Sequence, residues 1–276
     1  MIQYIDTHTH IDGEEFREDL ADVVQRAKDA GAVKLFVPGI NAASVETIKA
    51  VCKQFPDYCY GMIGLHPEDV RADYADVIAE MRRIQEADEA LTLAEKDNAQ
   101  HSAGSRPWIA VGEIGLDFYW SREFEKEQLA AFEMQVQWAI EAKLPLMIHC
   151  RKAQNEMVKI LRKYEGKLHG GVFHCFTGNA HEAEELLAFD GFALGIGGVL
   201  TFKKSNLPET LAAAVPLNRI VLETDAPYMA PVPHRGTRNE SAYITHVIDK
   251  LAEVYGTTPE EVGRITTETA LQVFNF

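Results

Sequence analysis

The chain has 276 residues, of which 46% are hydrophobic, and a formal net charge of −15 at pH 7. This composition is sufficient for a substantial core and includes no apolar run long enough to cross a bilayer. The charge excludes a general nucleic-acid binder with a basic face, because such proteins gain affinity by neutralising phosphates; any nucleic acid should bind locally, as a single strand or an end.

Short apolar runs alternate with longer segments of helical period, which is the pattern of repeating β–α units. The predicted strands are Ile2–Asp6, Lys34–Val37, Tyr60–Leu65, Ile109–Glu113, Leu146–His149, Val172–His174, Phe192–Ile196 and Arg219–Glu223. Amphipathic helices are predicted between them, among them Phe16–Ala30, Glu125–Ala142, Ala153–Tyr164, Ala180–Phe189, Ser241–Tyr255 and Pro259–Phe274.

Eight alternations in a chain of this length predict an α/β fold, a (β/α)8 TIM barrel, as a single domain over residues 1–276. A doubly wound open sheet is built from the same units and is the alternative. The candidate ligands follow the first, fourth, fifth, sixth and eighth predicted strands. Only a closed ring of strands brings all of those ends to one mouth, which favours the barrel.

An acidic insertion at about residues 68–107 does not fit a minimal barrel. Between Glu68 and Gln100 there are ten acidic and four basic residues, and a polar, turn-prone stretch follows. We interpret the segment as a solvated helix with a surface loop, and a functional lid is the alternative.

The first candidate ligands are His8 and His10. Alternate side chains of a strand point the same way, so these two imidazoles face together and can chelate one cation. Asp6 shares their face and could orient an imidazole from behind. Two histidines spaced like this are a weak signal on their own, since many such pairs lie on the surface.

Glu113 lies at the end of an apolar strand, between Gly112 and Gly115. An isolated buried carboxylate costs several kcal/mol, and a bound metal removes that cost. A simple salt bridge is the alternative.

Two further predicted strands each end in a histidine, His149 and His174. A lone strand-end histidine is more often a hydrogen-bonded core residue, but two on successive strands, beside the residues above, favour metal ligation. Cys150 and Cys175 each come one residue later, so we assign both to packing on the helix side.

Asp225 comes just after the eighth predicted strand, where barrel enzymes place catalytic groups. It can bind a metal ion and accept a proton from water, and Glu223 shares its face as a supporting residue. Four histidines and two carboxylates are enough for two metal ions that share a carboxylate, an arrangement suited to phosphoester hydrolysis.

The ordered set of motifs resembles the TatD-type deoxyribonucleases of the amidohydrolase superfamily. It comprises HTH near the start, GLHP, GEIGLD, the two strand-end histidines, and ETDAPY followed by PVPHRG. The likeness extends over essentially the whole chain. Only the acidic insertion departs from the compact family pattern, and it leaves the metal motifs untouched.

The resemblance implies that His8, His10, Glu113 and Asp225 hold one ion, and that Glu113, His149 and His174 hold the other. Glu113 and Asp225 would be the catalytic residues, with Asp225 as general base. It also implies a metal-dependent hydrolase of nucleic-acid phosphodiesters, typically a 3′–5′ exonuclease on single-stranded DNA. Mg²⁺ or Mn²⁺ is expected for activity, with Zn²⁺ as the alternative that suits imidazole.

Positively charged groups are predicted where a phosphate would arrive. Arg151 follows His149, and its planar guanidinium suits a pair of phosphate oxygens. His66, His234 and Arg235 are the other predicted substrate contacts. Lys203 and Lys204 are interpreted as solvated surface residues.

Other functions use nearly the same ligands. An amidohydrolase-type deaminase or lactonase, or a D-aminoacyl-tRNA deacylase, is the main alternative, and a non-catalytic metal or nucleic-acid binder is a second. The start of the chain lacks a basic signal-peptide region, and the four cysteines have no metal-knuckle spacing. We therefore expect a cytoplasmic protein with free thiols and without membrane association. We also expect a monomer.

Overall fold

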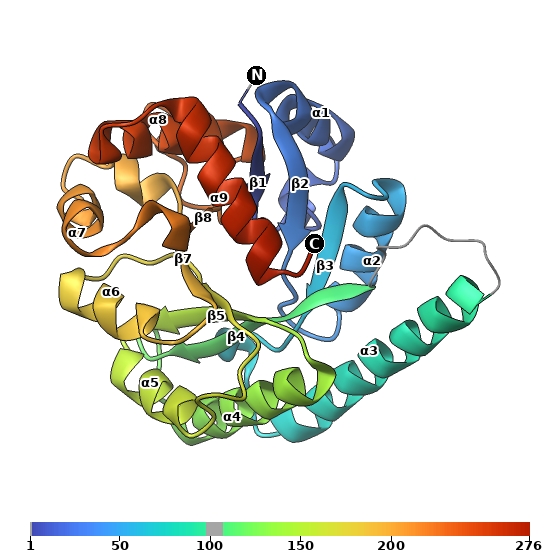
Figure 1. The fold of residues 1–276 in the computed structure, drawn as a ribbon. Helices are drawn as coiled ribbons and strands as arrows, with labels where there is room; N and C mark the ends of the chain where they lie inside the picture. The colour runs from blue at the N-terminus through green and yellow to red at the C-terminus, as the bar shows by residue number, and fades with distance from the viewer. Residues whose placement is uncertain (1, 98–106) are drawn as a thin grey trace. The chain divides into compact units, whose positions relative to one another are not determined.

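The computed structural model describes residues 2–97 and 107–276. Its strands belong to one eight-stranded sheet in the order β1 to β8, with helices between successive strands (Figure 1). This confirms the predicted (β/α)8 barrel. The strands are β1 (Tyr4–Asp6), β2 (Ala32–Val37), β3 (Cys59–Ile63), β4 (Trp108–Asp117), β5 (Leu146–Arg151), β6 (Gly171–Phe173), β7 (Phe192–Ile196) and β8 (Ile220–Leu222).

The α-helices are α1 (Leu20–Ala30), α2 (Ser44–Gln54), α3 (Tyr74–Asp97), α4 (Glu125–Ala142), α5 (Gln154–Arg162), α6 (Ala180–Leu187), α7 (Leu207–Ala214), α8 (Ile244–Tyr255) and α9 (Pro259–Val273). Short 3-10 helices are η1 (Glu14–Phe16), η2 (Pro67–Asp69), η3 (Gly198–Thr201), η4 (Leu217–Arg219) and η5 (Ser241–Tyr243). The predicted bounds of α4 are confirmed, whereas α1 begins later than predicted because η1 occupies the start of that segment. Among the described residues, no helix is both long and apolar enough to span a membrane.

The chain divides into two compact units, and each is described by itself. The first unit comprises residues up to Val37 together with Val172–Asn275. In it β1 pairs with β2, and β7 with β8, in parallel. The rings of Phe173 and Phe192 stack in its core with centroids 4.9 Å apart.

Backbone hydrogen bonds join the end of β1 to the end of β8 within the first unit. The N–H of Thr7 donates to the carbonyl of Leu222 at 2.9 Å, and the N–H of Asp225 donates to the carbonyl of His8 at 2.9 Å. These bonds bring the residues that follow the two strands to the same place.

The second unit comprises Pro38–Gly171 and Phe276. Its strands β3, β4 and β5 pair in parallel. Helix α3, which runs beside α4 (Figure 1), is fixed by two buried indoles. The Nε1 of Trp138 donates to Gln85 Oε1 and that of Trp108 to Asp88 Oδ2, each at 3.0 Å. The helix predicted within the acidic insertion is therefore confirmed, while residues 98–106 lie outside the described residues.

Strand β4 continues four residues beyond its predicted end at Glu113. Gly115 makes this possible: its φ is +147°, and a Cβ there would lie 1.8 Å from the carbonyl oxygen of His149 on β5. Glycine at this position therefore allows β4 and β5 to approach closely. The longer strand carries Asp117 to the same face as Glu113.

Candidate metal centre

Two imidazoles meet just beyond the end of β1. His8 and His10 are buried, and their Nε2 atoms lie 3.2 Å apart. Asp225 Oδ1 lies 3.9 Å from Nε2 of His8 and 3.6 Å from Nε2 of His10. The prediction that the two imidazoles point the same way is confirmed, and three potential ligand atoms converge.

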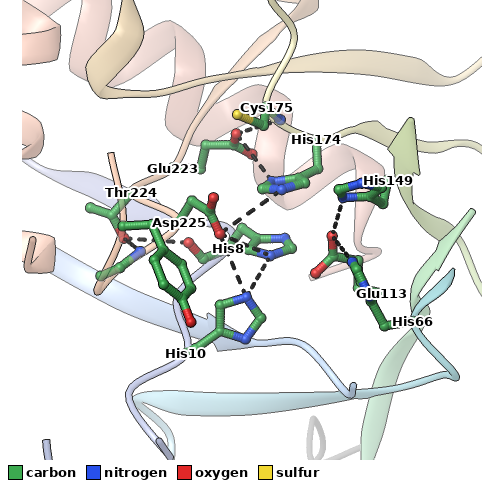
Figure 2. A network of polar contacts seen from close by, with 12 residues as sticks. His8, His10, His66, Glu113, His149, His174, Cys175, Glu223, Thr224 and Asp225 are labelled. Carbon is green, nitrogen blue, oxygen red and sulfur yellow. Dashed lines mark hydrogen bonds and ion pairs between the residues drawn. The ribbon is translucent and has the colours of Figure 1, made fainter. Parts of the chain in front are cut away.

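His174, which follows β6, joins this group (Figure 2). Its ring stacks on His8 with centroids 3.6 Å apart, and its Nε2 lies 4.0 Å from Asp225 Oδ1. Its Nδ1 lies 3.2 Å from Glu223 Oε1. A carboxylate behind an imidazole fixes the orientation of the ring and raises its basicity as a ligand, so Glu223 has the supporting position that the sequence predicted. We call His8, His10, His174, Glu223 and Asp225 the first cluster.

Asp6 is buried beside the first cluster, but the contacts of its carboxylate are to backbone and hydroxyl groups. It accepts hydrogen bonds from the N–H groups of His8 and Thr224 and from the hydroxyls of Thr224 and Ser241. The prediction that it orients an imidazole is therefore wrong. Burial raises the pKa of Asp6 to about 7, although these hydrogen bonds lower it. Asp6 instead ties together the backbone segments that carry the ligands.

The backbone of Asp225 is in the left-handed region, with φ of 55°, a conformation that aspartate tolerates better than most residues. Burial alone would raise the pKa of its carboxyl. A hydrogen bond with His10 and the charges of the neighbouring imidazoles outweigh burial, and the pKa is lowered. The side chain is therefore held as a carboxylate, the form that binds a cation or accepts a proton.

Cys175 also faces the first cluster. Its sulfur and ligand atoms of His174 and Asp225 lie within 4.8 Å of one another. The assignment of Cys175 to the helix side is therefore wrong. Strand alternation does not apply here because β6 ends at Phe173 and Cys175 has a φ of 49°. Its N–H donates to Glu223 Oε1 at 2.6 Å.

Gly195 on β7 makes room for Glu223. A Cβ at this position would lie 2.1 Å from Glu223 Oε2 and 2.6 Å from its Cδ. Gly195→Ala should therefore push the carboxylate away from His174 and lower the free energy of unfolding by about 1–3 kcal/mol, the usual range for overpacking. Thermal unfolding of the purified variant measures this effect.

A double variant provides the control. If the clash with Glu223 causes the loss of stability, adding Gly195→Ala to the Glu223→Ala variant should change the free energy of unfolding little. The carboxylate that the new methyl group would meet has been removed in that variant. Additive losses of stability in the double variant, or an unchanged melting temperature of Gly195→Ala, would contradict this explanation.

A second group, formed by His66, Glu113 and His149, lies in the second unit. The Glu113 side chain is 3% exposed, and its Oε1 lies 2.9 Å from Nδ1 of His149 and 3.3 Å from Nε2 of His66. One ligand atom of each residue lies within 4.8 Å of the other two. These three residues, the second cluster, could hold a cation.

Asp117, the last residue of β4, is a further site residue that was not predicted from the sequence. Its Oδ2 lies 2.9 Å from Nε2 of His149, and its Oδ1 accepts a hydrogen bond of 2.8 Å from the N–H of Tyr119. Burial would raise the pKa of Asp117, but these hydrogen bonds outweigh it and the pKa is lowered. Asp117 therefore orients His149 as a carboxylate. The sequence did contain a signal for this role, because residues four positions apart on a strand share a face and Asp117 therefore lies on the same face as Glu113.

Of the predicted substrate contacts, His66 and Arg151 lie in the second unit. His66 closes the turn before η2, because its Nδ1 accepts a hydrogen bond from the N–H of Glu68, while its Nε2 faces Glu113. It thus belongs to the second cluster as well as to a turn. Arg151, the last residue of β5, is exposed and lies over the ring of Tyr119.

The other two predicted contacts, His234 and Arg235, lie in the loop after β8 in the first unit. The His234 ring stacks on Tyr243 with centroids 3.8 Å apart. The guanidinium of Arg235 lies 3.7 Å from the ring centroid of Phe202. Arg235 borders a cavity of about 480 Å³ that is also lined by Val199, Phe202, Lys203, Lys204, Ser205 and Val232. Lys203 and Lys204 are exposed, which agrees with their interpretation as solvated surface residues, and they also line this cavity.

Comparison with known proteins identifies close relatives. The chain matches the family described as TatD related DNase over residues 5–275. It is 33% identical over 271 residues to the uncharacterized metal-dependent hydrolase YabD of Bacillus subtilis strain 168, with 98% of each chain covered. It is also 33% identical over 274 residues to the 3′-5′ ssDNA/RNA exonuclease TatD of Pectobacterium carotovorum subsp. carotovorum strain PC1, again with 98% of each covered.

A solved structure agrees with these matches. The crystal structure of YJJV, a TatD homolog from Escherichia coli K12, superposes with a TM-score of 0.85 at 26% identity, covering 99% of this chain and 98% of that one. The match of sequence and fold extends over nearly the full length, and both clusters consist of residue types that bind metals. The chain therefore belongs to the TatD-related DNase family of metal-dependent hydrolases.

Proposed function

We propose that this hydrolase removes nucleotides from the 3′ end of single-stranded DNA with the help of two divalent metal ions. The observation that supports this most strongly is the first cluster, in which three imidazoles and a carboxylate from Asp225 converge after the ends of parallel strands. The relative named as a 3′-5′ ssDNA/RNA exonuclease supports the substrate class.

The donor atoms fit divalent cations. In the first cluster, the Nε2 atoms of His8 and His10 lie 3.2 Å apart and could share an ion, and the lowered pKa of Asp225 keeps a negative charge beside them. In the second cluster, Glu113 is buried against imidazoles. We propose Mg²⁺ or Mn²⁺ as the ions for activity, because they suit phosphoester chemistry, with Zn²⁺ able to occupy imidazole-rich sites.

His8, His10 and Asp225 would hold one ion, and Glu113 and His149 the other. When bound, the ions supply an acidified water and neutralise charge on the phosphate oxygens. Asp225 would accept the proton of the attacking water, while Glu223 holds His174 and Asp117 holds His149 in position. The bridging role of Glu113 and the assignment of His174 to the second ion stay predictions of the sequence.

The preference for single strands follows from charge. A chain with a net charge of −15 is repelled by a long duplex, but Arg235, Lys203 and Lys204 line one cavity and can meet the phosphates of a flexible strand. His234 and Arg151 are proposed to contact substrate as well. We further expect a cytoplasmic monomer, and light scattering after size exclusion would test the oligomeric state.

A metal titration tests the proposal. Protein treated with EDTA should lose hydrolysis of single-stranded DNA, and Mg²⁺ or Mn²⁺ should restore it with release of mononucleotides from the 3′ end. Double-stranded DNA should be cut more slowly under the same conditions. Bis-p-nitrophenyl phosphate serves as a second phosphodiester substrate, and the alternatives are represented by a lactone, a nucleobase amine and a D-aminoacyl-tRNA. Turnover confined to the last three, with the phosphodiesters intact, would refute a nuclease.

A further inference from the structure

Two large aromatic side chains are exposed directly after β4. Tyr119 is 50% exposed and Trp120 is 67% exposed, and their ring centroids lie 4.8 Å apart at an interplanar angle of 82°. By contrast Trp108 and Trp138, the other two tryptophans of the chain, are each 1% exposed. Two adjacent aromatic side chains that are both at least half exposed commonly mark a binding surface.

Arg151 adds positive charge to the pair. Its guanidinium carbon lies 3.8 Å from the ring centroid of Tyr119 and 5.2 Å from that of Trp120. Unpaired nucleobases stack on aromatic rings and on the plane of an arginine guanidinium. The N–H groups at the edge of the guanidinium can at the same time donate to a phosphate. We call Tyr119, Trp120 and Arg151 the aromatic platform.

The aromatic platform is joined to the second cluster by a short chain of hydrogen bonds. The backbone N–H of Tyr119 donates to Asp117 Oδ1, and Asp117 Oδ2 contacts His149. Asp117 and Trp120 also line the same cavity of about 220 Å³, together with Pro67, Glu68, Val70, Arg71, Ser121, Glu123, Phe124 and Gln128. A base held on Trp120 would therefore lie next to the residues that position a ligand of the metal.

We propose that the aromatic platform stacks the unpaired base of the nucleotide next to the cleaved phosphodiester, and that Arg151 contacts its phosphate. This rests on the proposed nuclease function and adds to it a reason for strand selectivity. A base paired and stacked within a duplex does not offer its face to Trp120, whereas a frayed or single-stranded end does. Recognition is then independent of sequence but requires a base, so an abasic end should be a poor substrate.

Tryptophan fluorescence gives a direct readout of binding. Because the other two indoles are buried, acrylamide should quench mainly Trp120, and a thymidine tetranucleotide with a phosphorothioate 3′ linkage should shield it and change its emission. The same tetranucleotide with an abasic 3′ residue should have roughly tenfold weaker affinity, the size of one lost stacking contact.

Variants extend the test to turnover. Trp120→Leu should raise the KM for the single-stranded tetranucleotide roughly tenfold and remove the discrimination against the abasic end, while Trp120→Phe should retain most of both because its ring still stacks. Leu91→Ala, at a 63% exposed apolar residue of α3, is the matched control and should leave KM unchanged.

The outcomes separate this proposal from the function on which it rests. The aromatic platform is overturned, and the nuclease function stands, if the parent protein hydrolyses bis-p-nitrophenyl phosphate but its tryptophan emission does not change on addition of the tetranucleotide. The same conclusion follows if Trp120→Leu still prefers an intact 3′ end to an abasic one. If an intact 3′ base protects Trp120 from acrylamide quenching but no phosphodiester is hydrolysed, the aromatic platform is supported and the nuclease function is overturned.

Discussion

Asp225→Asn should lower kcat for phosphodiester hydrolysis on the order of a thousandfold, the upper range for a lost general base. The carboxylate lies among the imidazoles of the first cluster with a lowered pKa, so it is ionised and can accept a proton at neutral pH. The isosteric amide cannot accept that proton, although its oxygen can still face a cation. Steady-state kinetics together with the metal content of the purified variant measure both properties.

Metal content distinguishes the two roles of Asp225. Retained metal with lost kcat supports the role as base, whereas loss of both indicates that the carboxylate acts chiefly as a ligand. Asp76→Asn, at an exposed position of α3, is the matched control and should behave as the parent protein does. Activity of Asp225→Asn within tenfold of the parent would rule out the proton-acceptor role.

Glu113→Ala should abolish detectable hydrolysis and reduce the bound metal, without unfolding the protein. The substitution removes the only carboxylate among the three residues of the second cluster, and with it the contacts to His149 and His66. A cation that loses a charged ligand from a buried site loses much of its binding energy. Elemental analysis, circular dichroism and a single-stranded DNA digestion report the three properties.

The number of ions lost tests the bridging prediction for Glu113. Loss of both ions is expected if this carboxylate holds both, and loss of one if it belongs to the second cluster alone. Glu209→Ala, at an exposed glutamate of α7, is the matched control. Full turnover by Glu113→Ala in saturating metal would contradict a catalytic role for this carboxylate.

The sequence predicted the alternation of strands and helices because hydrophobic period is a local property. Phe192–Ile196 and Glu125–Ala142 were predicted at the bounds that the structure has. Local signals failed at the end of β4, which was predicted to stop at Glu113 but continues to Asp117. Glycine stands there because of the close approach of β5, a tertiary contact that sequence period does not reveal.

Within the candidate site, strand alternation was applied to residues that lie beyond the strand ends, with different outcomes. It gave the right shared direction for His8 and His10, which follow β1, but the wrong face for Cys175, which follows β6 in a left-handed conformation. Asp6 was assigned to an imidazole because it shares the face of His8 and His10. The assignment failed because a sequence does not show which of several nearby donors a buried carboxylate accepts hydrogen bonds from. The exposure of Trp120 likewise depends on packing that no motif encodes.

The join between β1 and β8 has a consequence for the biosynthesis of this enzyme. The hydroxyl of Thr7 donates to Leu222, 215 positions later, and that of Ser241 donates to Asp6, 235 positions earlier. Contacts of such high sequence separation form late in folding, because closing a long loop must precede the gain from pairing. A nascent chain on the ribosome therefore holds His8 and His10 without Asp225, and hydrolysis can begin only after nearly the whole polypeptide has been translated.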